Sequence, residues 1–140
     1  MMPPAVRLAL SASGVFLLLG LATGVWKYRR IMTSPDHRAP VYVDIAHRAA
    51  LLYSFAALVM MKLVEYSPYS SAVQMWATSV PLFFFVLALL SYVYHGVLED
   101  TENQLAERSF LTTWGMAFLI AGEIGGVLVL FWGFVSTQVL

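Results

Sequence analysis

The sequence predicts an all-α integral membrane protein built as a bundle of four membrane-spanning helices. Hydrophobic residues make up 60% of the 140 residues and charged residues only 11%, whereas soluble domains carry about 25% charged residues. The apolar residues also gather in four runs, each long enough to cross a hydrocarbon core of ~30 Å, which takes ~20 helical residues. These runs cover approximately residues 6–28, 41–62, 72–97 and 110–135, within one domain over residues 1–140.

Helices are the expected form of these runs because backbone polar groups inside lipid must be bonded within their own segment. The alternating pattern of barrel strands is absent. The formal net charge is zero, and without a basic tail no nucleic-acid partner is expected. Cysteine is also absent, which excludes disulfide exchange and a thiolate-bound metal or haem. The sequence contains no zinc-binding motif, no phosphate-binding glycine loop and no nucleophile elbow around a serine, so hydrolysis by these routes is not expected.

The first run shows no clear signal-peptide cleavage site, so we expect it to be retained as a span. Gly20 and Gly24 form a small-xxx-small pair, which would let a neighbouring helix approach closely. The run ends in an aromatic and basic belt at residues 26–30, typical of a membrane boundary. The loop 31–40 contains Ser-Pro-Asp and Ala-Pro, which predict an ordered turn, and Pro40 suits the start of the second helix.

A short turn at residues 66–71 predicts that the second and third helices are antiparallel neighbours. Pro81 lies inside the third run and is expected to kink it. An acidic stretch at residues 98–104 follows that run. The fourth run holds Glu123, which is flanked by Gly122, Gly125 and Gly126.

The distribution of Lys and Arg predicts the orientation. The side that holds the loops 29–40 and 98–109 carries most of the positive charge, at Lys27, Arg29, Arg30, Arg38 and Arg108, with Arg48 close by. The opposite side has only Arg7 and Lys62. We therefore expect both loops to be cytoplasmic and both termini to lie outside.

Three ionisable residues stand near the start of the second run, where Asp44, His47 and Arg48 share one helical face. His47 lies about 9 Å inside the helix start. Its imidazole could be an axial ligand of haem iron, a proton carrier, a hydrogen-bond partner of Asp44, or a structural interface histidine. Asp44 could orient the histidine or pair with Arg48. Arg48 could bind a propionate or an acidic loop residue, or extend to the headgroups.

Glu123 lies roughly 20 Å into the fourth helix, near the bilayer midplane. On insertion scales, the free energy of placing an acidic residue at this depth of the membrane is about +2.5 to +3.5 kcal/mol. The carboxyl is therefore expected to be protonated, paired or exposed to a polar cavity. The structural alternative to a functional role is a hydrogen bond to another helix, for example to Thr78, Tyr53 or Ser54.

Tyrosine hydroxyls could also meet a buried ligand. Tyr53 lies six residues beyond His47 and roughly 120° from it around the helix, and Tyr92 and Tyr94 stand near the end of the third run. We take Tyr53, Tyr94 and Glu123 as the candidate catalytic residues. His95 is a less favoured second axial ligand, because a boundary histidine followed by glycine is commonly a helix-end feature.

Three short matches give the chain a resemblance to the styrene oxide isomerase family: Gly24-Val25-Trp26, Ala46-His47 and Asn103-Gln104. Those proteins are small four-helix membrane enzymes that rearrange epoxides to carbonyl compounds with ferric haem b as a Lewis acid. The resemblance implies that His47 is the metal ligand. It also implies a trimer with haem between neighbouring subunits.

Two departures from the family pattern concern the reaction. Tyr53 stands where the family has an asparagine. The catalytic tyrosine of the family is matched only loosely by Tyr92 or Tyr94, because the loop that follows is shorter here. Haem binding could therefore be present while the epoxide reaction differs or is missing.

Three functions follow from these residues. The first is a membrane protein that binds haem b through His47, Arg48 and Asp44. An isomerase activity of this protein would act on small hydrophobic epoxides that arrive through the lipid bilayer. The second is an oligomeric proton-coupled transporter in which Glu123 alternately binds a proton and a lipophilic cation. Small multidrug exporters carry their glutamate in the first helix instead, which weighs against it. The third is a non-catalytic membrane subunit. A homo-oligomer is expected for the first two.

Overall fold

The computed structural model describes residues 1–106 and 109–140, and it confirms the four-helix prediction. No strand occurs among these residues. All four helices are long and apolar enough to cross a membrane, so the chain is an integral, multi-pass membrane protein. They are α1 (Pro4–Thr33), α2 (Val41–Glu65), α3 (Ser71–Leu98) and α4 (Phe110–Gln138).

Residues of known capping preference set several helix ends. Pro4 opens α1 at its first position and Pro40 is the N-cap of α2, where proline lacks only an N–H that has no helical partner. Ser109 opens α4 with a capping box: its hydroxyl accepts the Thr112 N–H at 3.0 Å, and its own N–H donates to the Thr112 hydroxyl at 2.7 Å.

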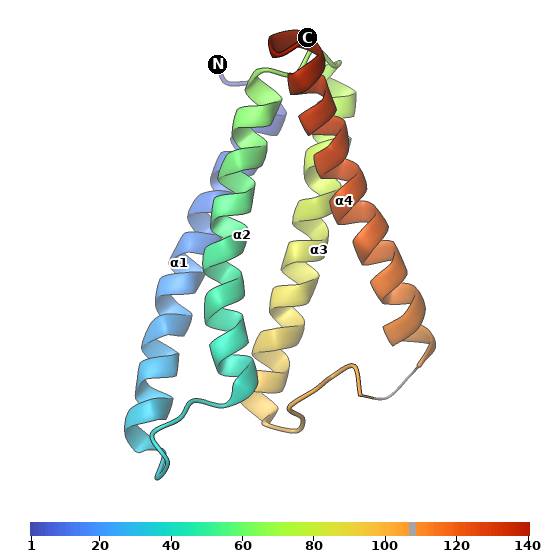
Figure 1. Ribbon diagram of the computed structural model, residues 1–140. Coiled ribbons are helices and arrows are strands. Elements are labelled where there is room, and N and C mark those ends of the chain that lie inside the picture. The colour runs from blue at the N-terminus through green and yellow to red at the C-terminus, as the bar shows by residue number, and fades with distance from the viewer. Residues whose placement is uncertain (107–108) are drawn as a thin grey trace.

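The two chain ends lie together at one end of the bundle, and the α1–α2 and α3–α4 loops lie at the other (Figure 1). We call the second end the loop end. This arrangement places Lys27, Arg30 and Arg38 at one end, as the orientation argument requires. Arg108, which also entered that argument, lies outside the described residues.

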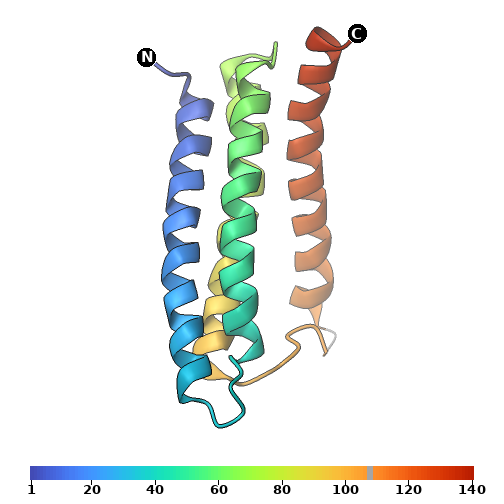
Figure 2. The ribbon, with the colours of Figure 1, turned by 60° about the vertical axis from the view of Figure 1, so that its left-hand side comes forward.

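Small residues hold α1 against α2 along most of their length (Figure 2). Ala9 and Ala50 are fully buried, and the Ser13 hydroxyl donates to the backbone oxygen of Ser54 at 2.9 Å. Gly20 and Gly24 both face α2, because an added Cβ at either position would collide with a residue of that helix. The small-xxx-small pair therefore makes a helix contact within one chain.

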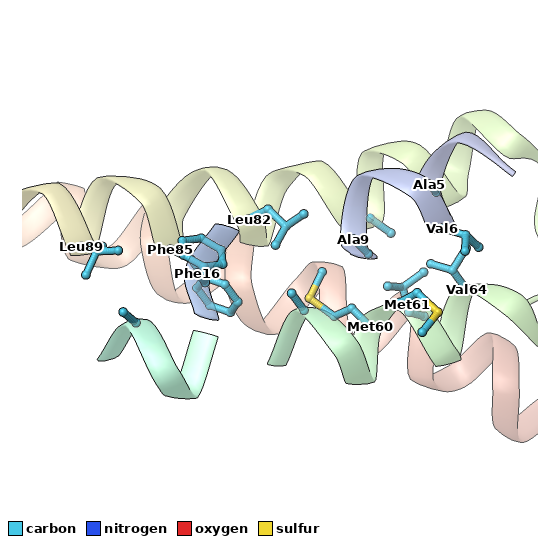
Figure 3. Packing of buried hydrophobic residues seen from close by; sticks show 14 of the residues in the cluster. Ala5, Val6, Ala9, Phe16, Met60, Met61, Val64, Leu82, Phe85 and Leu89 are labelled. Atoms are coloured by element: carbon cyan, nitrogen blue, oxygen red, sulfur yellow. The ribbon is translucent and has the colours of Figure 1, made fainter. Parts of the chain in front are cut away.

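An aromatic and aliphatic core joins α1, α2 and α3 (Figure 3). Phe16 packs edge-on against Phe85 with ring centroids 6.4 Å apart. Tyr53 stacks on the same Phe85 ring at 4.3 Å, with the ring planes 5° apart. These contacts fix which faces of α2 and α3 point inward.

α4 packs on α3 at the proline position. Pro81 takes away the hydrogen bond that the Ala77 carbonyl would receive in a regular helix. An added Cβ at Gly126 would lie 2.6 Å from that carbonyl oxygen and 2.5 Å from Pro81, so the backbone of α4 rests directly on this site. Toward the loop end α4 diverges from α3 (Figure 1), and nothing lies within 4 Å of an added Cβ at Gly115.

Candidate functional site

His47 is anchored by a backbone group of the neighbouring helix. Its Nδ1 atom lies 2.8 Å from the carbonyl oxygen of Gly20 in α1. A carbonyl oxygen only accepts hydrogen bonds, so Nδ1 carries the hydrogen and donates it. In a neutral imidazole the lone pair then remains on Nε2. The half-buried ring is thus held in the tautomer that leaves Nε2 available as a ligand.

Gly24 supplies the surface against which this ring packs. A Cβ at position 24 would lie 2.9 Å from the His47 Cε1 and 3.2 Å from Nδ1. Gly20 and Gly24 therefore serve two purposes: they bring α1 close to α2, and they position the imidazole. The sequence carried a signal for the close approach of the two helices, because Gly20 and Gly24 are four residues apart and share one helical face.

Asp44 pairs with two cations and does not contact the histidine through a hydrogen bond. Its two carboxylate oxygens lie 2.5 Å from Lys27 Nζ and 2.7 Å from Arg48 Nη2. Of the two partners considered for Asp44, the structure shows Arg48, and Lys27 is an addition that the sequence analysis missed. The Arg48 side chain is 65% exposed, so one face of its guanidinium stays accessible.

His47 lines none of three pockets in the described part of the chain. A polar pocket of about 610 Å³ lies at the loop end, a shallower one of about 400 Å³ lies beside Lys27 and Arg48, and an apolar groove of about 420 Å³ runs between α3 and α4. Residues 1–106 and 109–140 also hold no group of three or more His, Asp or Glu side chains suited to a metal ion. An iron at His47 would therefore need other ligands, and a porphyrin provides four.

His95 lies in the wall of the loop-end pocket. Its Nδ1 is 2.8 Å from a carboxylate oxygen of Asp100, and its ring lies 5.3 Å from that of Tyr42. Gln104 closes the same region: its N–H donates to the Tyr42 hydroxyl at 2.6 Å, and its side-chain oxygen accepts from the Ser91 hydroxyl at 2.6 Å. His95 thus has loop partners of its own and shares none with His47.

The α1–α2 loop is the ordered turn that its prolines predict. The His37 N–H donates to the Ser34 carbonyl at 3.2 Å, and His37 adopts a left-handed conformation with φ 54°. The Ser34 hydroxyl donates to the Asp36 carboxylate, and this bond lowers the pKa of Asp36. No site role was expected for His37, and this turn geometry is the only role that the structure describes for it.

Glu123 carries a buried oxygen atom, Oε1, that has no hydrogen-bond partner among the described residues. None of the helix-to-helix bonds considered for it, to Thr78, Tyr53 or Ser54, is formed. Of these three, Tyr53 instead stacks on Phe85, with the ring centroids 4.3 Å apart.

The three candidate catalytic residues do not gather at one point. Tyr53 stacks on Phe85 in the core and Glu123 has a buried oxygen atom on α4, whereas Tyr94 is 60% exposed on the outer surface of α3. Tyr92 is the α3 tyrosine that faces inward, where its ring stacks on Tyr42 at 6.2 Å.

Comparisons of the chain with protein families, with curated proteins and with solved structures found no match.

Proposed function

We propose that this chain binds haem b and that Nε2 of His47 would hold its iron. The observation that carries the proposal is the 2.8 Å hydrogen bond from His47 Nδ1 to the Gly20 carbonyl. Metal-binding histidines almost always donate their second ring N–H to such an acceptor, which fixes the tautomer and makes the ligand nitrogen more basic.

The charged residues near His47 suit the propionate groups of haem. Arg48 directly follows His47 in the sequence. Lys27 and Arg48 both pair with the carboxylate of Asp44. An arginine with an accessible guanidinium face can bind a propionate in a bidentate manner. Asp44 would then balance the two cations and hold them in place.

The haem site is shared between copies of the chain in this proposal. His47 lines none of the three pockets described above, so in this proposal a bound haem would also be covered by a neighbouring copy. A homo-oligomer provides that cover, and the resemblance to the isomerases implies a trimer. Tyr94, which is exposed on α3, is available to a site between copies.

The reaction that we propose for the bound haem is the isomerisation of small hydrophobic epoxides. When bound, ferric haem would supply the Lewis acid for this reaction. The chain's own contribution is to hold the imidazole of His47 at a fixed angle near the membrane boundary, where an apolar substrate arrives from the lipid. We further propose that both loops at this end are cytoplasmic.

A visible-range spectrum of protein purified from haem-supplemented cells tests the proposal. We expect a Soret band in the wild type that is lost in His47→Ala and kept in His37→Asn, a matched control because asparagine tolerates the left-handed conformation of residue 37. Wild-type protein without a Soret band would overturn the proposal. A pigmented protein that leaves styrene oxide unchanged would keep the haem site and remove the isomerase activity.

A further inference from the structure

We propose that the pocket between the loop ends of α1 and α2 binds the phosphate group of an anionic phospholipid. This pocket, which we call the lipid pocket, has a volume of about 400 Å³, and its charged lining residues are Lys27, Arg38, Asp44 and Arg48. His47 does not line it, so the lipid site is separate from the nitrogen atom that we propose to hold the haem iron.

A shared carboxylate holds two of the three cations of the lipid pocket in place. Asp44 on α2 pairs with Lys27 of α1 at 2.5 Å and with Arg48 of its own helix at 2.7 Å. One carboxylate between two cations leaves one positive charge uncompensated. The Lys27 side chain is 30% exposed and the Arg48 side chain 65%, so both retain surface that a second anion can contact.

Arg38 adds the third cation from the ordered α1–α2 loop. It directly follows His37, whose backbone is fixed in a left-handed conformation, and it stands two residues before Pro40, the N-cap of α2. None of the ion pairs among residues 1–106 and 109–140 involves Arg38. With His37 neutral, three cations and one carboxylate give the pocket a net charge of +2. Phosphate oxygens suit this lining, because arginine binds them in a bidentate manner.

The apolar surface that continues from the pocket favours a lipid over a soluble phosphate. Arg48 shares one face of α2 with Leu52, Phe55 and Val59, because these residues follow each other at spacings of four, three and four. The three apolar side chains are 68%, 69% and 56% exposed. Acyl chains can therefore lie along this stripe while the phosphate stays at Arg48.

The depth of the cations matches the depth of lipid phosphates. Arg48 lies roughly 10 Å from the start of α2 at Val41, and Lys27 lies roughly 9 Å from the end of α1 at Thr33. Both are thus close to the boundary between hydrocarbon and headgroups. Basic pockets between membrane helices on the cytoplasmic side are typical sites for anionic headgroups, and the orientation that we propose places the loop end on that side.

Native mass spectrometry of the full chain in detergent micelles tests the proposal, because it counts bound lipids and gives the dissociation constant of the first one. We expect the first phosphatidylglycerol to bind at least about fivefold more tightly than phosphatidylcholine. Equal affinities would overturn the proposal. Soluble glycerol phosphate at the same concentration should not displace the lipid, and displacement would show that the pocket takes a free phosphate instead.

Three variants separate the lipid pocket from general surface charge. Arg38→Gln should weaken phosphatidylglycerol about fivefold. Arg29→Gln is the matched control, because Arg29 is exposed at the same end of α1 and lines none of the three pockets; it should leave the affinity unchanged. Asp44→Asn should act in the opposite direction and tighten binding about fivefold, because it frees Lys27 and Arg48.

Two outcomes of these variants would contradict the proposal. Equal losses in Arg38→Gln and Arg29→Gln would show attraction to the overall charge of the loop end rather than a site. Unchanged or weaker binding in Asp44→Asn would also overturn it. Circular dichroism identifies a variant that fails to fold; if Arg38→Gln does, Asp44→Asn decides instead.

Lys27 and Arg48 are also the cations that we propose for the haem propionates, so the two sites need to be told apart. His47→Ala should bind phosphatidylglycerol as the wild type does, and Arg38→Gln should keep the Soret band. If the preference for phosphatidylglycerol were lost in His47→Ala and kept in Arg38→Gln, the lipid pocket would be refuted. A colourless wild type with this preference would refute the haem proposal alone.

Discussion

The imidazole of His47 lies so close to the backbone of Gly24 that a methyl group at position 24 would come within 2.9 Å of its Cε1 atom. The contact joins α1 to α2 and also fixes the angle of the ring. Glycine at position 24 is therefore required by the histidine as much as by the packing of the two helices.

Gly24→Ala should displace the His47 ring. The added methyl group overpacks the contact, which typically costs 1–3 kcal/mol, and it should weaken or shift the Soret band that we predict. Gly14→Ala is the matched control, because nothing lies within 4 Å of a Cβ at position 14; that change should leave both properties unaltered. Unfolding in mixed detergent micelles measures the stability of each variant, and a spectrum unaffected by Gly24→Ala would argue against His47 as the iron ligand.

Asp44→Asn should leave the His47 ring in place. The carboxylate pairs with Lys27 and Arg48, and these partly exposed pairs are worth about 0–1 kcal/mol. We expect a small, salt-dependent loss of stability and an unchanged position of the Soret band, since the Gly20 carbonyl orients the imidazole. A shifted band at constant stability would instead show that Asp44 acts on the histidine.

The fold could be predicted because it depends on run length and apolarity alone. A span needs ~20 apolar residues, and the prolines and the acidic stretch mark the limits of each run. The helices extend a few residues beyond the predicted spans, as Thr33 at the end of α1 shows, because helices continue past the hydrocarbon into the headgroup region.

The candidate site was less predictable, for reasons that differ between residues. His47 is oriented by a backbone carbonyl, and a carbonyl has no side-chain signature in the sequence. Tyr92 and Tyr94 are 200° apart on a helix wheel, so only one of them can face inward. The spacing of Phe85, Leu89 and Tyr92 identifies Tyr92 as the inward one. The sequence therefore held that signal, but the candidate catalytic residues taken from it included Tyr94 and not Tyr92.

Gly126→Ala should loosen α4 from the bundle. Its Cβ would lie 2.6 Å from the Ala77 carbonyl oxygen, and a backbone atom cannot move aside as a flexible side chain can. We expect a loss of about 1–3 kcal/mol, measured by unfolding in mixed micelles. At the neighbouring Gly125 a Cβ meets nothing within 4 Å, so Gly125→Ala should cost nothing. Equal effects of the two changes would contradict the packing of α4 on Pro81.

Single cysteines should report the orientation, since the chain contains no cysteine of its own. Ser70 in the α2–α3 turn and Glu102 in the α3–α4 loop are both exposed, and they lie at opposite ends of the bundle. Because positive charge concentrates at the loop end, a membrane-impermeant maleimide added to intact cells should label Ser70→Cys and leave Glu102→Cys unlabelled until the membrane is permeabilised. The reverse pattern would place the loops and the His47 end outside, and labelling of both without permeabilisation would indicate that the chain inserts in two orientations.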